Sequence, residues 1–228
     1  LPNPLAAIAA APALAPLHGR TFRMLWFAWL AANLTMWMND VAAAWLMTQL
    51  TTSPVMVALV QTASTLPVFL LGLPSGALAD IVDRRRYFAG TQLWVSINAL
   101  VLAALSLADA LSANLLLART FVNGVGLAMR WPVFAAIVPE LVPREELPQA
   151  LGLNSIAMNA SRIIGPVLAG ALIAGAGSAY VFALNAALSM ASALAIWLWK
   201  RDAAPVSVLP GERFVGAALD SIFAQDYR

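Results

Sequence analysis

Six long apolar runs, separated by short polar or charged turns, constrain this chain more than any other feature. A helix needs about 20 apolar residues to cross the roughly 30 Å hydrocarbon core of a bilayer. The runs cover residues 22–47, 54–79, 87–108, 115–138, 148–174 and 179–199. We therefore predict an all-α integral membrane protein with six transmembrane helices, whose principal surroundings are the lipid bilayer.

The composition supports the same class and excludes others. Of the 228 residues, 61% are hydrophobic and 11% charged, whereas soluble domains average about 45–50% and 25%. With no cysteine and one histidine, the chain offers neither a disulfide framework nor a thiol-based site, and we predict no metal and no cofactor. A formal net charge of +2 is too small to indicate nucleic acid, so we expect no such partner.

Basic residues lie at alternate ends of the predicted helices. They are Arg20, Arg23, Arg84, Arg85, Arg86, Arg144, Lys200 and Arg201. The turns after the first, third and fifth runs contain no Lys or Arg. Because loops rich in Lys and Arg stay in the cytoplasm, we predict that both termini of the membrane domain are cytoplasmic.

The two ends of the chain differ from the membrane domain, which we assign to residues 21–200. Residues 1–20 are rich in Ala and Pro and lack the basic start and apolar core of a signal peptide, so we predict a flexible cytoplasmic tail. The chain opens on Leu1, which is typical of a trimmed or partial sequence. Residues 201–228 are predicted to be a cytoplasmic linker followed by either a short interfacial helix or a frayed end.

The second and fifth runs resemble each other. Residues 72–78 read Gly-Leu-Pro-Ser-Gly-Ala-Leu, and residues 165–172 read Gly-Pro-Val-Leu-Ala-Gly-Ala-Leu. Gly and Pro are common in membrane helices, which is one explanation. The other is a three-plus-three inverted repeat, since the matched helices are three spans apart and run in opposite directions.

The loop after the second run holds the most specific motif, Gly-Ala-Leu-Ala-Asp-Ile-Val-Asp-Arg-Arg-Arg at residues 76–86. It resembles the signature of the major facilitator superfamily between its second and third helices. Ile81 replaces the usual basic residue and Asp83 the usual glycine. A tight left-handed turn at Asp83 is compatible with aspartate.

Other segments resemble the bacterial family that includes the enterobactin exporter. They are Phe-Arg-Met-Leu-Trp at 22–26, Leu-Thr-Thr-Ser-Pro at 50–54, Pro-Glu-Leu-Val-Pro at 139–143, Leu-Asn-Ser at 153–155 and Asn-Ala-Ser-Arg-Ile-Ile-Gly-Pro at 159–166. Gly165, Pro166 and Gly170 also resemble part of a fifth-helix motif associated with antiporters, and we expect them to pack helices closely.

The resemblance covers residues 21–200 and implies half of a twelve-helix secondary transporter in the bacterial inner membrane. It implies proton-coupled export of a small amphipathic molecule such as a siderophore or a drug. The chain is then a fragment, a truncated product or a half that needs a missing C-terminal half or a second copy. The alternative is a six-helix substrate-binding or scaffold subunit that works with a partner.

The resemblance also implies a conformational latch formed by Gly76, Asp80, Arg84 and Arg85. A carboxylate at the end of one helix can cap the N-terminus of another, and the arginines can hold Asp80 in place. Alternatively, the basic residues only set topology and bind anionic lipid.

Ionisable residues within the predicted spans mark a candidate transport pathway, because each costs about 2.5–3.5 kcal/mol at a helix centre. They are Asp40, Arg119, Arg130 and Arg162. At 1.5 Å per residue, Asp40 reaches Arg119 or Arg162 more easily than Arg130, which lies toward the inner side. A static ion pair or a snorkelling arginine is the alternative explanation.

From these charges we predict a proton or substrate site made of Asp40, Arg162, Asn159, Arg130 and Trp37. Asp40 is the expected proton or cation site, and Arg162 the group that attracts anions. Trp37 and Trp131 lie deep enough in their spans to line an apolar cavity, although packing is the better explanation for each.

Catalytic motifs are lacking in the sequence. It contains no Gly-x-Ser-x-Gly, no His-Glu-x-x-His and no phosphate-binding Gly-x-x-x-x-Gly-Lys-Ser/Thr loop. We therefore predict that the chain is neither an enzyme nor a nucleotide-driven pump.

Overall fold

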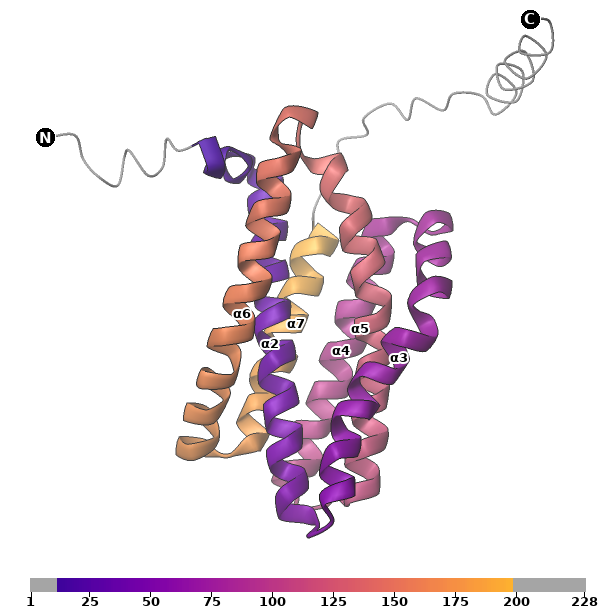
Figure 1. Ribbon diagram of the computed structural model, residues 1–228, viewed down its shortest axis with the longest axis vertical. Coiled ribbons are helices and arrows are strands. Elements are labelled where there is room, and N and C mark those ends of the chain that lie inside the picture. Colours follow the sequence, from indigo (N-terminus) through magenta and orange to yellow (C-terminus); the bar gives the residue numbers. More distant parts are fainter. Residues whose placement is uncertain (1–11, 199–228) are drawn as a thin grey trace, which may run out of the picture.

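The computed structural model describes residues 12–198, apart from the side chains of Pro12 and Asp80. The predicted C-terminal linker and interfacial helix, and residues 1–11 of the predicted tail, lie outside this part. Within it, all regular structure is helical (Figure 1). The elements are η1 (Pro12–His18), α2 (Arg20–Leu50), α3 (Pro54–Ile81), α4 (Arg84–Leu107), α5 (Ala113–Leu141), η2 (Arg144–Glu146), α6 (Leu147–Ala176) and α7 (Ser178–Leu198).

Local sequence explains where these helices begin and end. Helix α3 starts with Pro54 in its first turn, where the missing N–H costs nothing. The side chain of Ser112 accepts a hydrogen bond from the Leu115 N–H at the start of α5. Helix α6 ends at Gly177, whose φ of 102° is accessible to glycine at little steric cost.

Five of these helical segments are long and apolar enough to cross a membrane: Pro54–Ala79, Arg84–Leu107, Ala113–Leu141, Arg144–Ala176 and Ser178–Leu198. Helix α2, with 31 residues, is long enough, but Asn33, Asn39 and Asp40 lower its hydropathy. It nevertheless runs along the bundle beside the other helices (Figure 1). The sequence predicted six spans, and five of them meet the criteria of length and apolarity.

The helices pack in a definite pattern. Helix α2 packs against α6 and α7, α4 packs against α5 and α7, and α3 packs against α5. Helices α6 and α3 lie on opposite flanks of the bundle in Figure 1. Two apolar clusters fill the interior, one including Phe22, Phe88 and Phe134, the other including Met47 and Phe182.

Glycines permit the closest helix contacts. A Cβ on Gly165 of α6 would lie 2.7 Å from the Trp37 Cβ of α2, and one on Gly124 of α5 would lie 2.6 Å from the Ser64 carbonyl oxygen of α3. Pro166 is partly buried beside Gly165. A Cβ on Gly170 or Gly76, in contrast, would meet no described atom within 4 Å.

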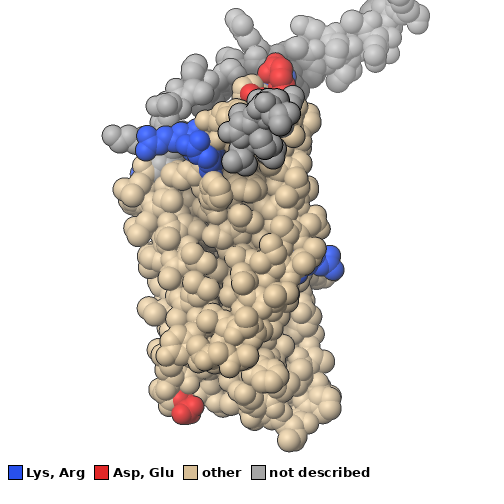
Figure 2. Space-filling view, turned by 90° about the vertical axis from the view of Figure 1, so that its left-hand side faces the viewer, with Lys and Arg blue, Asp and Glu red and all other residues tan. Residues whose placement is uncertain are grey.

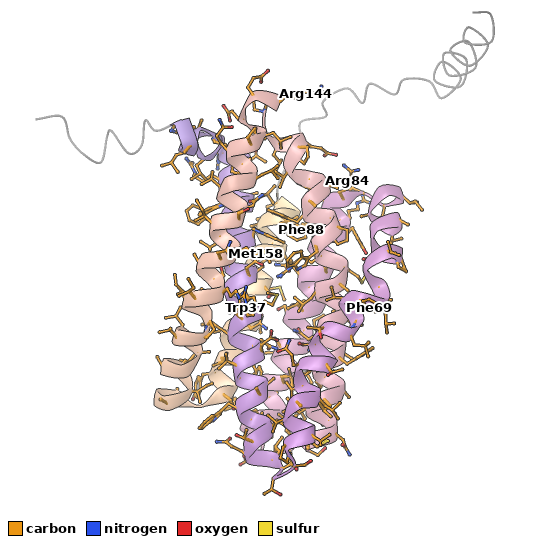
Figure 3. The ribbon with its side chains drawn as sticks, viewed as in Figure 1. Trp37, Phe69, Arg84, Phe88, Arg144 and Met158 are labelled. Atoms are coloured by element: carbon orange, nitrogen blue, oxygen red, sulfur yellow. The ribbon has the colours of Figure 1, made fainter. Side chains whose placement is uncertain are left out.

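The two flanking helices carry large exposed apolar side chains. Phe69 and Leu73 on α3 are 86% and 89% exposed, and Ile163 on α6 is 72% exposed. Figure 3 shows Phe69 pointing away from the bundle. In Figure 2, a broad surface without charge separates the charged ends, interrupted by one basic side chain part-way along. Such a surface suits lipid or another apolar protein surface.

Part of the predicted flexible tail is structured. Residues Pro12–His18 form the 3-10 helix η1, and its Leu14 and Leu17 pack against the cluster that contains Phe22. Burial of these two leucines stabilises the segment on the end of the bundle.

Candidate functional site

A buried cation lies between α5 and α2. Arg130 is 1% exposed, and its Nη1 donates a hydrogen bond of 3.0 Å to the carbonyl oxygen of Ala32. Its Nη2 lies 3.7 Å from the sulfur of Met36. The Nε atom has no hydrogen-bond partner within the described residues. Arg130 is thus held by a carbonyl dipole, and within the described residues it has no carboxylate partner.

Aromatic rings surround this arginine. The Arg130 Cζ lies 5.2 Å from the ring centre of Trp29, within the range of a cation–π interaction. The Trp29 ring stacks on Phe134, with centres 3.7 Å apart and planes 3° apart. Trp131 meets the same indole edge-on, with centres 6.2 Å apart. The guanidinium therefore lies at the base of an aromatic wall contributed by α2 and α5.

A pocket of about 230 Å³ adjoins this aromatic wall, between α2, α5 and α6. Trp29, Trp131 and Phe134 line it together with Asn154, Ser155 and Met158 of α6. Figure 3 marks Met158 on α6 and Trp37 further along α2. The pocket combines a large apolar lining with a few polar atoms, the usual composition of a small-molecule site.

Asp40 does not form the ion pair that its depth along the bundle permits. Within the described residues it makes neither a hydrogen bond nor an ion pair with Arg119 or Arg162. The Arg162 Cζ lies 5.7 Å from the Trp37 ring centre instead. The backbone carbonyl of Arg119 accepts a hydrogen bond from the Asn98 side chain of α4. Similar depth does not pair these residues, because depth along the bundle does not fix the direction of a side chain.

Three of the predicted site residues nevertheless lie close together. Asp40 is one helical turn from Trp37 on the same face of α2, and Arg162 of α6 lies over that tryptophan. Asp40 and Trp37 are partly buried, and Arg162 is exposed. Asn159 is also exposed, and it donates to the Ser155 carbonyl of its own helix. These residues and Arg130 lie on the helices α2, α5 and α6 that line the pocket.

The basic loop after α3 ties three helices together. Arg84 Nη1 donates to Glu140 Oε1 of α5 at 2.5 Å and to the Ala136 carbonyl at 3.2 Å. Arg85 donates to the carbonyl oxygens of Ile196, at 3.0 Å, and Trp197 at the end of α7. The end of α5 and the end of α7 are thereby fixed to the start of α4.

Two acidic residues of the motif, Asp80 and Asp83, lie where α3 ends and α4 begins. Asp83 has φ −55°, so it does not adopt the left-handed turn that aspartate would tolerate there. Its carboxylate instead caps α4 by accepting the Arg86 N–H at 2.9 Å, which removes the need for a glycine. Asp80 belongs to α3, but its side chain is outside the described part, and the latch role assigned to it remains a prediction.

Sequence reasoning missed Glu140, Trp29, Phe134 and Gly124. Glu140 follows Pro139 near the end of α5, and an acid at the same depth as a basic loop is a signal that points to this pair. The stack of Trp29 on Phe134 leaves no such trace, because it depends on the rotation of two helices about their axes.

The family of this chain follows from comparison with known proteins. Residues 11–225 match the family model described as transmembrane secretion effector, of the MFS type. The chain belongs to this family. The prediction of a major facilitator is therefore confirmed, and the family is one of transporters, not of enzymes. The finer likeness to the enterobactin exporter stays a prediction.

The chain is similar to several named transporters. The uncharacterised MFS-type transporter YfiS of Bacillus subtilis is 31% identical over 68% of this chain and 36% of its own. The macrolide efflux protein A of Streptococcus pyogenes is 24% identical over 74% and 40%. The staphyloferrin A transporter of Staphylococcus aureus is 26% identical over 60% and 35%. The aligned part of this chain spans well under half of each relative.

A solved structure shares the fold. A bacterial homologue of the human lysosomal transporter Spinster superposes with a TM-score of 0.64 at 17% identity, over 80% of this chain and 43% of that one. The helical bundle of this chain therefore has the same fold as the matched part of that transporter.

Proposed function

We propose that this chain forms one six-helix half of a secondary active exporter for a small amphipathic molecule, driven by protons. The observation that carries the proposal is the buried Arg130, which lies against an aromatic wall beside a pocket that α2, α5 and α6 share. A desolvated cation inside a membrane bundle is expensive and usually marks a pathway for substrates or ions. The aromatic lining suits the apolar part of the same substrate.

Helix packing supports a three-plus-three inverted repeat. If α2, α3 and α4 are exchanged with α5, α6 and α7, the α2–α6 contact becomes the α5–α3 contact, and α2–α7 becomes α5–α4, while α4–α7 maps onto itself. All of these contacts occur. Helix α2 begins and α5 ends at the same end of the bundle (Figure 1), as inversion requires. In this arrangement α2 also crosses the membrane, which brings the number of spans to six.

The exposed flanks support the need for a second half. Helices α3 and α6 carry several of the most exposed apolar side chains, on either side of the α2 and α5 face. The relatives that match are considerably longer than the aligned part. We propose that a C-terminal half, or a second copy of the chain, covers these flanks and closes the pocket into a central cavity.

We further propose that the protein lies in the bacterial inner membrane with both termini of the bundle in the cytoplasm. Arg84 and Arg144 lie toward the same end of the bundle in Figure 3, and the turn at Asp109 belongs to the other end. Fusions of alkaline phosphatase and green fluorescent protein test the orientation. The phosphatase is expected to be active after Asp109 and inactive after Arg144, and the reverse result contradicts the proposal.

Transport itself is tested with the full-length protein in a host that lacks its own drug and siderophore exporters. The names of the relatives make macrolides and siderophores the first compounds to assay. We expect export that stops when a protonophore collapses the proton gradient. Export that survives the protonophore contradicts proton coupling. If an inserted, folded protein binds these compounds but exports none of them, the alternative of a binding or scaffold subunit replaces the proposal.

A further inference from the structure

A second and larger cavity lies at the end of the bundle opposite the arginine loop. Its volume is about 640 Å³, and it is lined by the C-terminal parts of α2, α4 and α6, by the turn at Asp109 and by the start of α7. It shares no lining residue with the pocket beside Arg130. A Cβ on Gly170 or Gly177, which line it, would meet no described atom within 4 Å, so these glycines leave space on the α6 side.

The lining has a distinct chemical character. Asp109 is the one ionisable residue among the described residues that line this cavity. Trp45, 50% exposed, provides an aromatic ring. Gln49, Ser106 and Ser178 add an amide and two hydroxyls. A single carboxylate beside an indole matches a monovalent cation with an apolar body, because the indole attracts cations as well as apolar groups.

The backbone at Asp109 gives an independent reason to assign this carboxylate a role. Its φ is 49°, and in the described part of the chain no other residue except glycine has a positive φ. The Asp109 N–H donates to the Ser106 carbonyl and the Ala110 N–H to the Leu105 carbonyl, at 3.3 and 3.0 Å. This is the helix ending in which glycine normally occupies the left-handed position. Aspartate tolerates this conformation better than most residues, and here it places an exposed carboxylate at the edge of the cavity.

We propose that this cavity binds an amphipathic organic cation, with Asp109 as the counter-charge and Trp45 as the ring that the cation contacts. Two sources can supply this chemistry at a membrane surface: a free lipophilic ammonium or phosphonium compound, or the ammonium headgroup of phosphatidylethanolamine. The site is separate from the proposed transport pocket, so its existence does not depend on the transport function.

Binding is measured by calorimetry with the full-length protein in nanodiscs of phosphatidylglycerol, after subtraction of protein-free nanodiscs. The probe is tetraphenylphosphonium, and tetraphenylborate has nearly the same shape with the opposite charge. We expect saturable binding of the cation that Asp109→Asn weakens about fivefold and Trp45→Leu about threefold. Asparagine tolerates the left-handed turn, so this variant removes the charge and keeps the fold. Glu145→Gln, at the other end of the bundle, is the matched control and should bind as the wild type does.

The proposal is overturned if the cation does not bind, if tetraphenylborate binds equally well, or if Asp109→Asn has the wild-type affinity while its thermal unfolding is unchanged. A second titration in nanodiscs with phosphatidylethanolamine separates the two sources. A weaker apparent affinity for the probe there assigns the cavity to the lipid headgroup, and an unchanged affinity assigns it to a free cation.

Discussion

The Nη1 atom of Arg130 on α5 donates to the carbonyl oxygen of Ala32 on α2, 3.0 Å away. The proposed inverted repeat exchanges α2 with α5, so this contact joins the two repeats. It also leaves a buried guanidinium without a carboxylate partner in the described part of the chain. In a purely structural role, such a cation is an inefficient way to hold two helices, because desolvation of the charge offsets much of what the hydrogen bond contributes.

Replacement of Arg130 distinguishes a structural role of this residue from a role in transport. We expect Arg130→Met to keep the free energy of unfolding within about 1 kcal/mol of the wild type, because a buried charge can be replaced by an apolar side chain of similar volume at little cost. Export should nevertheless be abolished. Thermal unfolding in detergent and export from cells provide the two measurements. A variant that unfolds normally and still exports at the wild-type rate assigns Arg130 a structural role only.

We expect loss of the ion pair between Arg84 and Glu140 to affect transport more than stability. Its side chains are 30% and 33% exposed, so the pair contributes at most about 1 kcal/mol to folding. Arg84→Glu is expected to slow export, and the double variant Arg84→Glu with Glu140→Arg to restore part of it. Arg86→Gln, whose side chain is exposed, is the control. If the double variant is no better than the single one, the ion pair itself is not the latch.

A methyl group at Gly165 should destabilise the bundle. The new Cβ would lie 2.7 Å from the Trp37 Cβ and 3.2 Å from the Leu34 carbonyl oxygen, so α6 must move away from α2. We expect Gly165→Ala to lower the free energy of unfolding by about 1–3 kcal/mol. Gly170→Ala, on the same helix with nothing within 4 Å, should be neutral or slightly stabilising. Thermal unfolding compares them, and equal effects at both positions contradict the close packing of α6 on α2.

We expect replacement of Asp40 to change the coupling of transport to protons. It is partly buried beside Trp37 and lacks the ion pair with Arg119 or Arg162 that would hold it permanently ionised. Asp40→Asn in the full-length protein is expected to remove the dependence of export on external pH, and Glu145→Gln to preserve it. Export rates across a pH series make the comparison. An unaltered pH profile in Asp40→Asn rules out Asp40 as the proton site.

Some of this architecture is predictable from the sequence for a clear physical reason. Apolar runs bounded by charge identify spans because lipid demands length and hydropathy. The arrangement around Arg130 is different, because helices that are apolar on nearly every side have no strong amphipathic pattern to fix their rotation. The contacts of Arg130 with Ala32 and of Trp29 with Phe134 depend on that rotation. Because this rotation is not fixed by the sequence, depth alone does not decide whether Asp40 pairs with Arg119 or Arg162.

The central claim, that α2, α5 and α6 face a water-accessible transport cavity, is tested most directly by cysteine accessibility. The chain contains no cysteine, so single variants carry no background. Met158 of α6 lines the pocket, whereas Ile97 of α4, 52% exposed, is not one of the residues that line it. With the full-length protein in membranes, a water-soluble maleimide should label Met158→Cys, and substrate should slow that labelling, while Ile97→Cys in lipid stays unlabelled. Equal labelling at both positions, or labelling of Ile97→Cys alone, would contradict the account.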